Sequence, residues 1–276
     1  MRTPFIAGNW KMNLTVGKAR ELVRVLDEGL GAIPGVEVLV APPATALMAV
    51  IAELRESRIK VAAQNCHWEA SGAFTGEISP ELIRDLGCSH VIIGHSERRQ
   101  YFGETDETVN KKIHAALRAE LQVIACIGET LSEREAGKTM VIVETQLRGA
   151  LKGLSAGHME YVTVAYEPVW AIGTGKNATP DQAQEVHGHL RTVLRDLYGS
   201  AVADTVRIQY GGNEWGSHAY DSRTAIPGRT LPSTNSRLAP PPVEIWLTLF
   251  AKPLSCKADT ESPPPTTVTA PEAASA

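Results

Sequence analysis

A glutamate followed at once by proline, Glu167-Pro168, stands where a strand-like run meets a glycine-rich segment. The run 162–165 is rich in β-branched residues, and the proline biases Glu167 away from helical angles and ends the strand. The segment that follows, as far as Lys176, contains two glycines and can serve as a hinged lid. A carboxylate between a strand end and a lid suits a general base in a water-excluded site. A surface glutamate in an ordinary β–α connection is an equally simple interpretation.

Two other strand-like runs end in groups that can handle charge and protons. The first ends at Asn9, two residues before Lys11, whose ammonium group can stabilise a developing negative charge. The other is followed by His95 at the start of a short helix, whose first free amides would face the imidazole and favour its neutral form. A neutral His95 can act as an electrophile and proton relay. Glu97 could orient a neighbour or pair with a nearby arginine. A solvated lysine and a core or capping histidine are the simpler interpretations of each residue alone.

A fourth strand-like run ends at Gly211 and Gly212, where exposed backbone amides could cradle a phosphate, although a plain turn would also explain them. A base, a neutral imidazole, an ammonium group and an anion cradle together suit one reaction class. That class is proton transfer at a carbon next to a carbonyl, on a small phosphorylated substrate. No metal or organic cofactor is needed, because Lys11, His95 and backbone dipoles can stabilise an enediolate.

The elements that must position these groups alternate along the chain. Near-continuous apolar strands between amphipathic helices are typical of a parallel sheet that helices cover. We therefore predict an α/β fold, a (β/α)₈ barrel, in which the chemistry collects at the C-terminal ends of the strands. A doubly wound open sheet is the alternative, but the first strand–helix junction lacks G-x-G-x-x-G. The predicted strands are 5–9, 37–41, 60–64, 90–94, 122–127, 162–165 and 206–210.

Bulk properties narrow the function further. The chain has 276 residues, of which 43% are hydrophobic, so it can bury one large core. A net charge of -4 without a basic tract argues against nucleic-acid binding. We find no apolar run of signal-peptide or membrane length, and Cys66, Cys88, Cys126 and Cys256 have neither zinc-site nor disulfide-framework spacing. We therefore expect a cytoplasmic protein with no membrane partner and no metal site.

Several long motifs in order resemble the triosephosphate isomerase family over roughly residues 3–212. Gln64-Asn65 and the run 72–77 are similar to the dimer-interface loop of that family, and Tyr210-Gly211-Gly212 to its phosphate turn after the seventh strand. The other matching motifs are Ala7-Gly8-Asn9-Trp10-Lys11-Met12-Asn13, Ile93-Gly94-His95-Ser96-Glu97-Arg98-Arg99, Ala125-Cys126-Ile127-Gly128-Glu129-Thr130 and the run 165–176.

The resemblance implies interconversion of dihydroxyacetone phosphate and glyceraldehyde 3-phosphate. By analogy, Glu167 moves the carbon-bound proton and His95 relays protons between the two substrate oxygens, a pairing already known for this family. Lys11, with help from Asn9, would stabilise the enediolate. Glu97 completes the predicted catalytic group.

The resemblance also implies how substrate and subunits are held. Gly173 in the lid would contribute a phosphate-binding amide, beside those of Gly211, Gly212 and Asn213, and closure would keep water from the enediolate. A homodimer is implied, with Thr75 reaching into the active-site region of the partner subunit.

The pattern breaks after Gly212. Asn213 stands where the family usually has serine, which keeps the amide and loses the hydroxyl. Residues 1–213 are predicted to form the barrel, whereas 214–276 lack a regular eighth β–α unit, hold ten of the 17 prolines and are predicted to be largely disordered. The alternating run 243–250 could fill the gap between strands seven and one. Flanking prolines and the absence of a following phosphate turn disfavour it.

The tail leaves an alternative open for the function. An abrupt loss of match inside a motif is what a shifted reading frame would produce, and seven strands alone leave two open edges. The alternative is therefore a catalytically impaired or misfolded barrel that binds at most.

Overall fold

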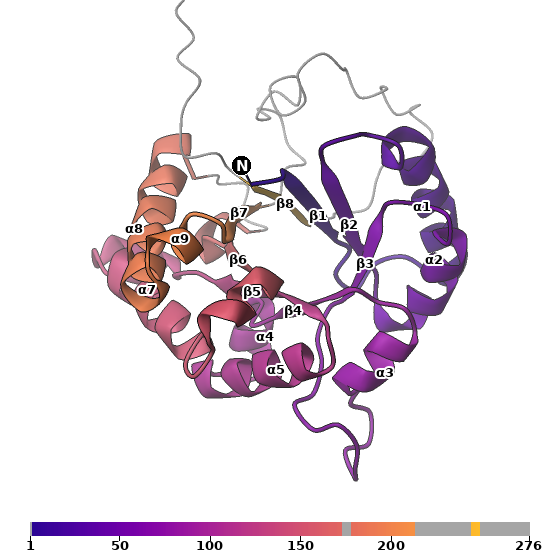
Figure 1. Cartoon of the computed structure of the whole chain (residues 1–276), viewed down its shortest axis with the longest axis horizontal. Helices are drawn as coiled ribbons and strands as arrows, with labels where there is room; N and C mark the ends of the chain where they lie inside the picture. The colour runs from indigo at the N-terminus through magenta and orange to yellow at the C-terminus, as the bar shows by residue number, and fades with distance from the viewer. Residues whose placement is uncertain (1, 173–177, 213–243, 249–276) are drawn as a thin grey trace, which may run out of the picture.

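A closed eight-stranded barrel with helices outside it is the framework of the protein (Figure 1). The computed structural model describes residues 2–172 and 178–212 and the backbone of 244–248. Neighbouring strands from β1 to β7 pair in parallel, as predicted. The strands are β1 Phe5–Asn9, β2 Glu37–Ala41, β3 Lys60–Ala63, β4 His90–Ile93, β5 Gln122–Ile127, β6 Val162–Tyr166, β7 Arg207–Gly212 and β8 Glu244–Thr248.

The helices follow the strands along the chain and lie outside the ring, with α1 and α2 beside β1 to β3 and α4 and α5 beside β4 and β5 (Figure 1). None of the described helices is long and apolar enough to cross a membrane. The α-helices are α1 Val16–Leu30, α2 Leu47–Glu53, α3 Pro80–Asp85, α4 Ser96–Tyr101, α5 Asp106–Arg118, α6 Leu131–Glu135, α7 Thr139–Ala150, α8 Pro180–Tyr198 and α9 Ser200–Ala203. Three short 3₁₀ helices are η1 Ala44–Ala46, η2 Ala156–Tyr161 and η3 Val169–Ala171.

The start of α8 illustrates how local sequence sets these boundaries. Thr179 caps the helix and accepts a hydrogen bond from the Gln182 amide, while Gln182 accepts one from the Thr179 amide. Pro180 occupies the first helical position, where a missing N–H costs nothing. Threonine, proline and glutamine at these spacings are typical of a helix start, so the local sequence accounts for where α8 begins.

Two layers of apolar side chains make up the core. One fills the barrel and the other lies between the strands and the helices, because successive residues of a strand face opposite sides of the sheet. The outer layer includes the buried stripe of α8, which contains Ala183, Val186, Leu190 and Leu194. Among the described side chains, the inner layer contains Phe5, Ala7, Leu39, Ala41, Ala62, Ile92, Ile124, Cys126 and Ala165.

The eighth strand differs from the sequence-based expectation. The sequence disfavours a strand in the run 243–250, yet Glu244–Thr248 forms β8 and pairs with both β1 and β7. Both pairings are antiparallel, so β8 replaces the eighth β–α unit of a regular barrel without reproducing it. The flanking prolines did not prevent the pairing, because they fall outside the paired residues. The predicted disorder of the rest of 214–276 lies outside the described residues.

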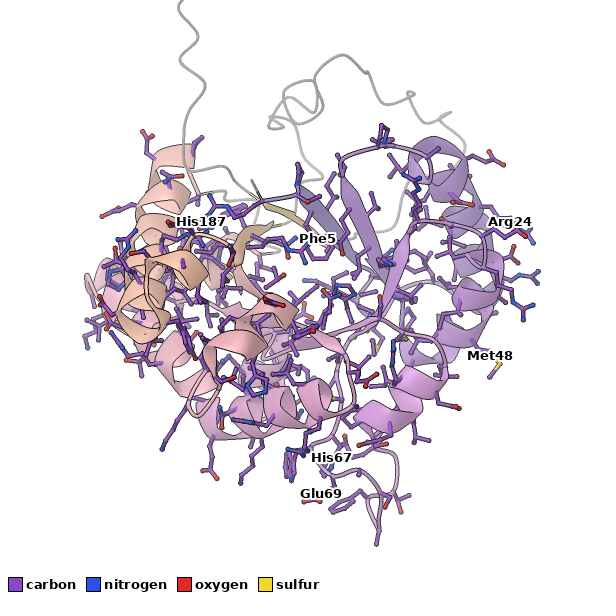
Figure 2. All side chains as sticks on the ribbon, in the orientation of Figure 1. Phe5, Arg24, Met48, His67, Glu69 and His187 are labelled. Carbon is purple, nitrogen blue, oxygen red and sulfur yellow. The ribbon has the colours of Figure 1, made fainter. Side chains whose placement is uncertain are left out.

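Two buried histidines give the fold a dependence on pH. His90, at the start of β4, lies beside Phe5 and within 3.7 Å of a Glu37 carboxylate oxygen. Burial, reinforced by the charges of Arg207 and Lys60, lowers its pKa to about 3 from the usual 6.5. His187 lies in α8 (Figure 2). Burial, the largest cause, also lowers the pKa of His187 to about 3. Both rings therefore stay neutral in the native state at pH values that protonate them in the unfolded chain.

We expect the free energy of unfolding to fall as pH drops from about 6.5 towards 3, by up to about 1.4 kcal/mol per pH unit for each histidine. In this window the unfolded state binds protons that the native state does not, so acid favours unfolding. Urea denaturation between pH 7.5 and 4.5 should show a shallower dependence for His187→Gln than for the unmodified chain. The exposed His158, changed to glutamine, is the control. Equal slopes in the unmodified chain and His187→Gln would contradict the assignment.

Candidate active site

Five predicted catalytic side chains meet at one rim of the barrel. They come from the carboxyl ends of β1, β4 and β6, which parallel strands bring to the same edge. Two contacts connect these strand ends across the rim. Lys11 Nζ donates to Glu97 Oε1, which joins the end of β1 to α4. The Ser96 amide donates to Glu167 Oε2, which joins α4 to the end of β6. The five residues are Asn9, Lys11, His95, Glu97 and Glu167.

Glu167 is fixed where β6 ends. Its amide donates to the Ile127 carbonyl at 2.8 Å, which extends the ladder with β5 by one residue, and the residue is 1% exposed. One carboxylate oxygen, Oε2, accepts a hydrogen bond from the Ser96 amide at 3.0 Å. The other, Oε1, lies 3.7 Å from His95 Nε2. The carboxylate is thus held in a dry position against the imidazole.

His95 is placed by a tight turn at the end of β4. Gly94 has a φ of 79°, and a Cβ there would lie 3.1 Å from the Cys126 carbonyl oxygen, so the turn requires glycine. His95 caps α4, and its Nδ1 accepts a hydrogen bond from the Glu97 amide at 3.2 Å. An accepting Nδ1 carries no proton, which assigns the proton of a neutral ring to Nε2. Nε2 is the nitrogen that faces Glu167.

Lys11 has an uncommon backbone conformation for a lysine, with a φ of 49°. Its amide donates to Asn9 Oδ1 at 3.0 Å, and its carbonyl accepts from Gln64 Nε2 at 2.9 Å. Its Nζ lies 2.8 Å from Glu97 Oε1. The ammonium group is therefore oriented by residues from three different strand ends.

Glu97 bonds to the lysine rather than to the neighbouring arginines. Arg98 bonds to Glu104, and Arg99 bonds to Asp106. Of the two interpretations given for Glu97 from the sequence, the structure favours the one in which it orients a neighbour, and that neighbour is Lys11.

A cavity of about 440 Å³ opens beside this rim. Asn9, Lys11, His95 and Glu97 line one side of it, and Gly76, Glu77 and Ile78 of the β3–α3 loop line another. The same loop carries His67 and Glu69 and projects away from the barrel (Figure 2). Within the described residues, no group of three or more histidine, cysteine or acidic side chains is placed to hold a metal ion.

Glu129 is a buried carboxylate that the sequence did not single out for a role. It is 0% exposed and accepts hydrogen bonds from the Tyr166 hydroxyl at 3.1 Å, Trp170 Nε1 at 2.9 Å and Arg134 Nη1 at 3.0 Å. Burial, and then the charge of Glu129, raises the pKa of the Tyr166 phenol far above its usual range. Glu129 thus links Tyr166 and Trp170, which lie before and after Glu167-Pro168 in the chain. Its place in the 125–130 motif was the only signal in the sequence.

The predicted phosphate-binding residues have mixed outcomes. Gly211 and Gly212 are buried and lie inside β7, paired with β8, where the sequence predicted an exposed turn. The run 243–250 supplies the partner strand, which is why the turn is not open. Gly173 and Asn213 fall outside the described residues. A role in binding phosphate stays a prediction for all four.

Comparison with known proteins identifies the family of this site. A family model described as triosephosphate isomerase matches residues 4–215. The chain belongs to the triosephosphate isomerase family. It is 54% identical over 213 residues to a triosephosphate isomerase of Trichlorobacter lovleyi, with 77% of this chain and 85% of that protein covered. It is 54% identical over 223 residues to one of Chloroherpeton thalassium, with 79% and 87% covered. With one of Moorella thermoacetica the identity is 56% over 213 residues, with 77% and 85% covered.

Proposed function

We propose that this chain interconverts dihydroxyacetone phosphate and glyceraldehyde 3-phosphate, with Glu167 as the base and His95 as the proton relay. The observation that carries the proposal is the pair itself. In a chain of the triosephosphate isomerase family, the buried Glu167 carboxylate lies 3.7 Å from His95 Nε2, while His95 Nδ1 accepts a hydrogen bond from the Glu97 amide. A base and a hydrogen-bond donor side by side suit proton transfer at a carbon next to a carbonyl.

The reaction needs only proton movements. Glu167 takes a proton from the carbon next to the carbonyl, and the C–H electron pair becomes the double bond of an enediolate. The negative charge develops on the former carbonyl oxygen, where His95 Nε2–H and the Lys11 ammonium group donate. His95 then helps to move a proton between the two oxygens, and Glu167 returns its proton to the neighbouring carbon. No redox or group-transfer cofactor takes part in this sequence.

The burial of the site strengthens these interactions. Glu167 is 1% exposed and His95 is 3% exposed, so the charges act through protein rather than through water. Asn9 and Lys11 would bind the substrate as well as stabilise the intermediate. Gly211 and Gly212, with Gly173 and Asn213, are proposed to hold the phosphate.

The proposal extends to a homodimer in the cytoplasm. Thr75 and Phe74 are exposed in the β3–α3 loop, and Met12 and Phe102 are exposed near the cavity beside Lys11. Large exposed apolar side chains around a cavity favour burial against another chain. The loop around Thr75 of one copy would enter the cavity of the other.

The function is tested by replacing the base. We expect Glu167→Gln to lower kcat by about 10²–10⁴-fold, the range that a general base contributes. The glutamine keeps the shape and the contact with the Ser96 amide but cannot accept the proton. Activity is measured in both directions by coupled assays, together with deuterium uptake at carbon in D₂O.

The matched control is Glu160→Gln, which removes the same charge at an exposed position. It should leave kcat unchanged. A folded chain without isomerase activity would overturn the proposed function, and normal activity in Glu167→Gln would overturn the proposed base.

A further inference from the structure

Lys11 adopts a backbone conformation that a lysine rarely takes. Its φ of 49° lies in the left-handed region, where a side chain crowds its own backbone. Such a conformation persists only where surrounding contacts hold it in place, and it is found most often at functional sites. The contacts around Lys11 therefore bear directly on where its ammonium group lies.

Gln64 supplies the contact on the carbonyl side. Gln64 follows β3, and its Nε2 donates to the Lys11 carbonyl at 2.9 Å and to the Ala41 carbonyl at 2.8 Å. The Ala41 carbonyl also accepts a hydrogen bond from the Trp10 amide at 3.0 Å, so the end of β2 holds both Gln64 and Trp10. On the other side, Asn9 Oδ1 accepts the Lys11 amide at 3.0 Å. The Lys11 peptide units are thus clamped between β1, β2 and β3.

A carboxamide suits this clamp. Its –NH₂ group is neutral and offers two donors in a fixed plane, one for each carbonyl. A carboxylate in the same place would face two carbonyl oxygens without a proton to donate. A thioether or an alkyl group would leave both carbonyls without this donor.

We propose that Gln64 is a positioning residue for catalysis, which holds the left-handed turn at Lys11 and so aims the ammonium group at the reacting oxygen. The proposal rests on the proposed role of Lys11 in the isomerase reaction. It adds to the interface role that the resemblance gave to the loop beginning at Gln64-Asn65, and the contacts that carry it are those of Gln64 with the Lys11 and Ala41 carbonyls.

The first test compares kcat and KM for Gln64→Glu, Lys11→Met and the double variant. We expect Gln64→Glu to lower kcat about 10–100-fold near pH 8, because a small displacement of a catalytic group costs about that much. The loss should shrink towards pH 6, where protonation of the introduced carboxylate restores one donor. In the Lys11→Met background the same change should lower kcat no further, because a positioning residue has nothing left to position.

Asn110 offers a matched control. Its Nδ2 also donates to two backbone carbonyls, those of Ala150 at 2.9 Å and Lys152 at 2.8 Å, away from the rim. Asn110→Asp should lower stability without changing kcat. A crystal structure of Gln64→Met, which keeps the side-chain length without donors, should show Lys11 outside the left-handed region.

The outcomes separate the two proposals. If Lys11→Met leaves kcat unchanged, the proposed role of Lys11 fails. The inference about Gln64 fails, and the proposed function stands, if Lys11→Met lowers kcat strongly while Gln64→Glu and Gln64→Met keep full kcat. It also fails if Gln64→Glu and Lys11→Met lower kcat additively in the double variant. If Gln64→Glu does not fold, Gln64→Met alone serves the same comparison.

Discussion

Gly128→Ala is expected to lower kcat by about 100-fold by displacing the backbone of the proposed base, at a residue with no side chain of its own. An added Cβ would lie 1.7 Å from the Glu167 carbonyl oxygen and 2.7 Å from its carbonyl carbon. Both atoms belong to the backbone, so no rotamer change can relieve the clash. Gly128 cannot easily retreat, because Gln146 bonds to both its amide and its carbonyl. The Glu167 peptide must therefore move.

The measurements are kcat, KM and the melting temperature of Gly128→Ala. Overpacking of this kind costs about 1–3 kcal/mol, which lowers Tm by roughly 2–4 °C per kcal/mol in a chain of this size. Gly188→Ala in α8 is the control, because nothing lies within 4 Å of an added Cβ there. It should leave kcat unchanged and keep or raise Tm, since alanine is the better helix former. Normal kcat in Gly128→Ala would mean that Glu167 tolerates displacement.

The parts of the site that the sequence predicted depend on local chemistry and on one rule of topology. Glu167 comes directly after a strand, and His95 comes directly before a helix. Parallel strands bring their carboxyl ends to one edge, so residues at those ends meet whatever their separation along the chain. The acceptor role of His95 Nδ1 also follows from its position as a helix cap. These features need no knowledge of side-chain packing.

The contacts that the sequence left undetermined join distant residues. Glu97 pairs with Lys11 across 86 positions, although Arg98 and Arg99 are nearer in sequence. Gly128 must be glycine because the Glu167 carbonyl passes over it, and Gln64 bonds to Lys11 across 53 positions. Each depends on how two strand ends are spaced around the rim. A pattern of residue types along the chain does not contain that spacing.

The tail shows a different limit. Alternating apolar residues predict a strand, but alternation has the same period in either direction, so it does not say whether the strand runs parallel or antiparallel. A parallel eighth strand requires a crossover back to the other end of the barrel. An antiparallel one enters at the rim where β7 ends, and β8 pairs Ile245 with Gly212 and Glu244 with Asn9 at that rim. The alternation in 243–250 is compatible with both directions, so the sequence pattern alone leaves the direction of β8 open.

Opening the barrel at β8 is expected to have the largest effect on stability. A chain that ends at Gly212 leaves β1 and β7 with unpaired backbone donors and acceptors, and such edges favour aggregation. We expect that chain to be largely insoluble or to unfold without a cooperative transition. Activity should be lost with the fold, since Asn9 and Lys11 lie at the end of β1, one of the two strands that lose a partner.

Leu247→Pro tests the same closure in a chain of full length. Leu247 pairs with Ile6 on one side and Tyr210 on the other, and proline lacks the N–H that a strand between two neighbours needs. The expected cost is about 3 kcal/mol, equivalent to a fall in Tm of roughly 6–12 °C. Leu247→Ile keeps the amide and serves as the control, with Tm within a few degrees of the unmodified chain. If Leu247→Pro melts like Leu247→Ile, and the chain ending at Gly212 is soluble and cooperative, then seven strands suffice and the pairing of β8 contributes nothing to stability.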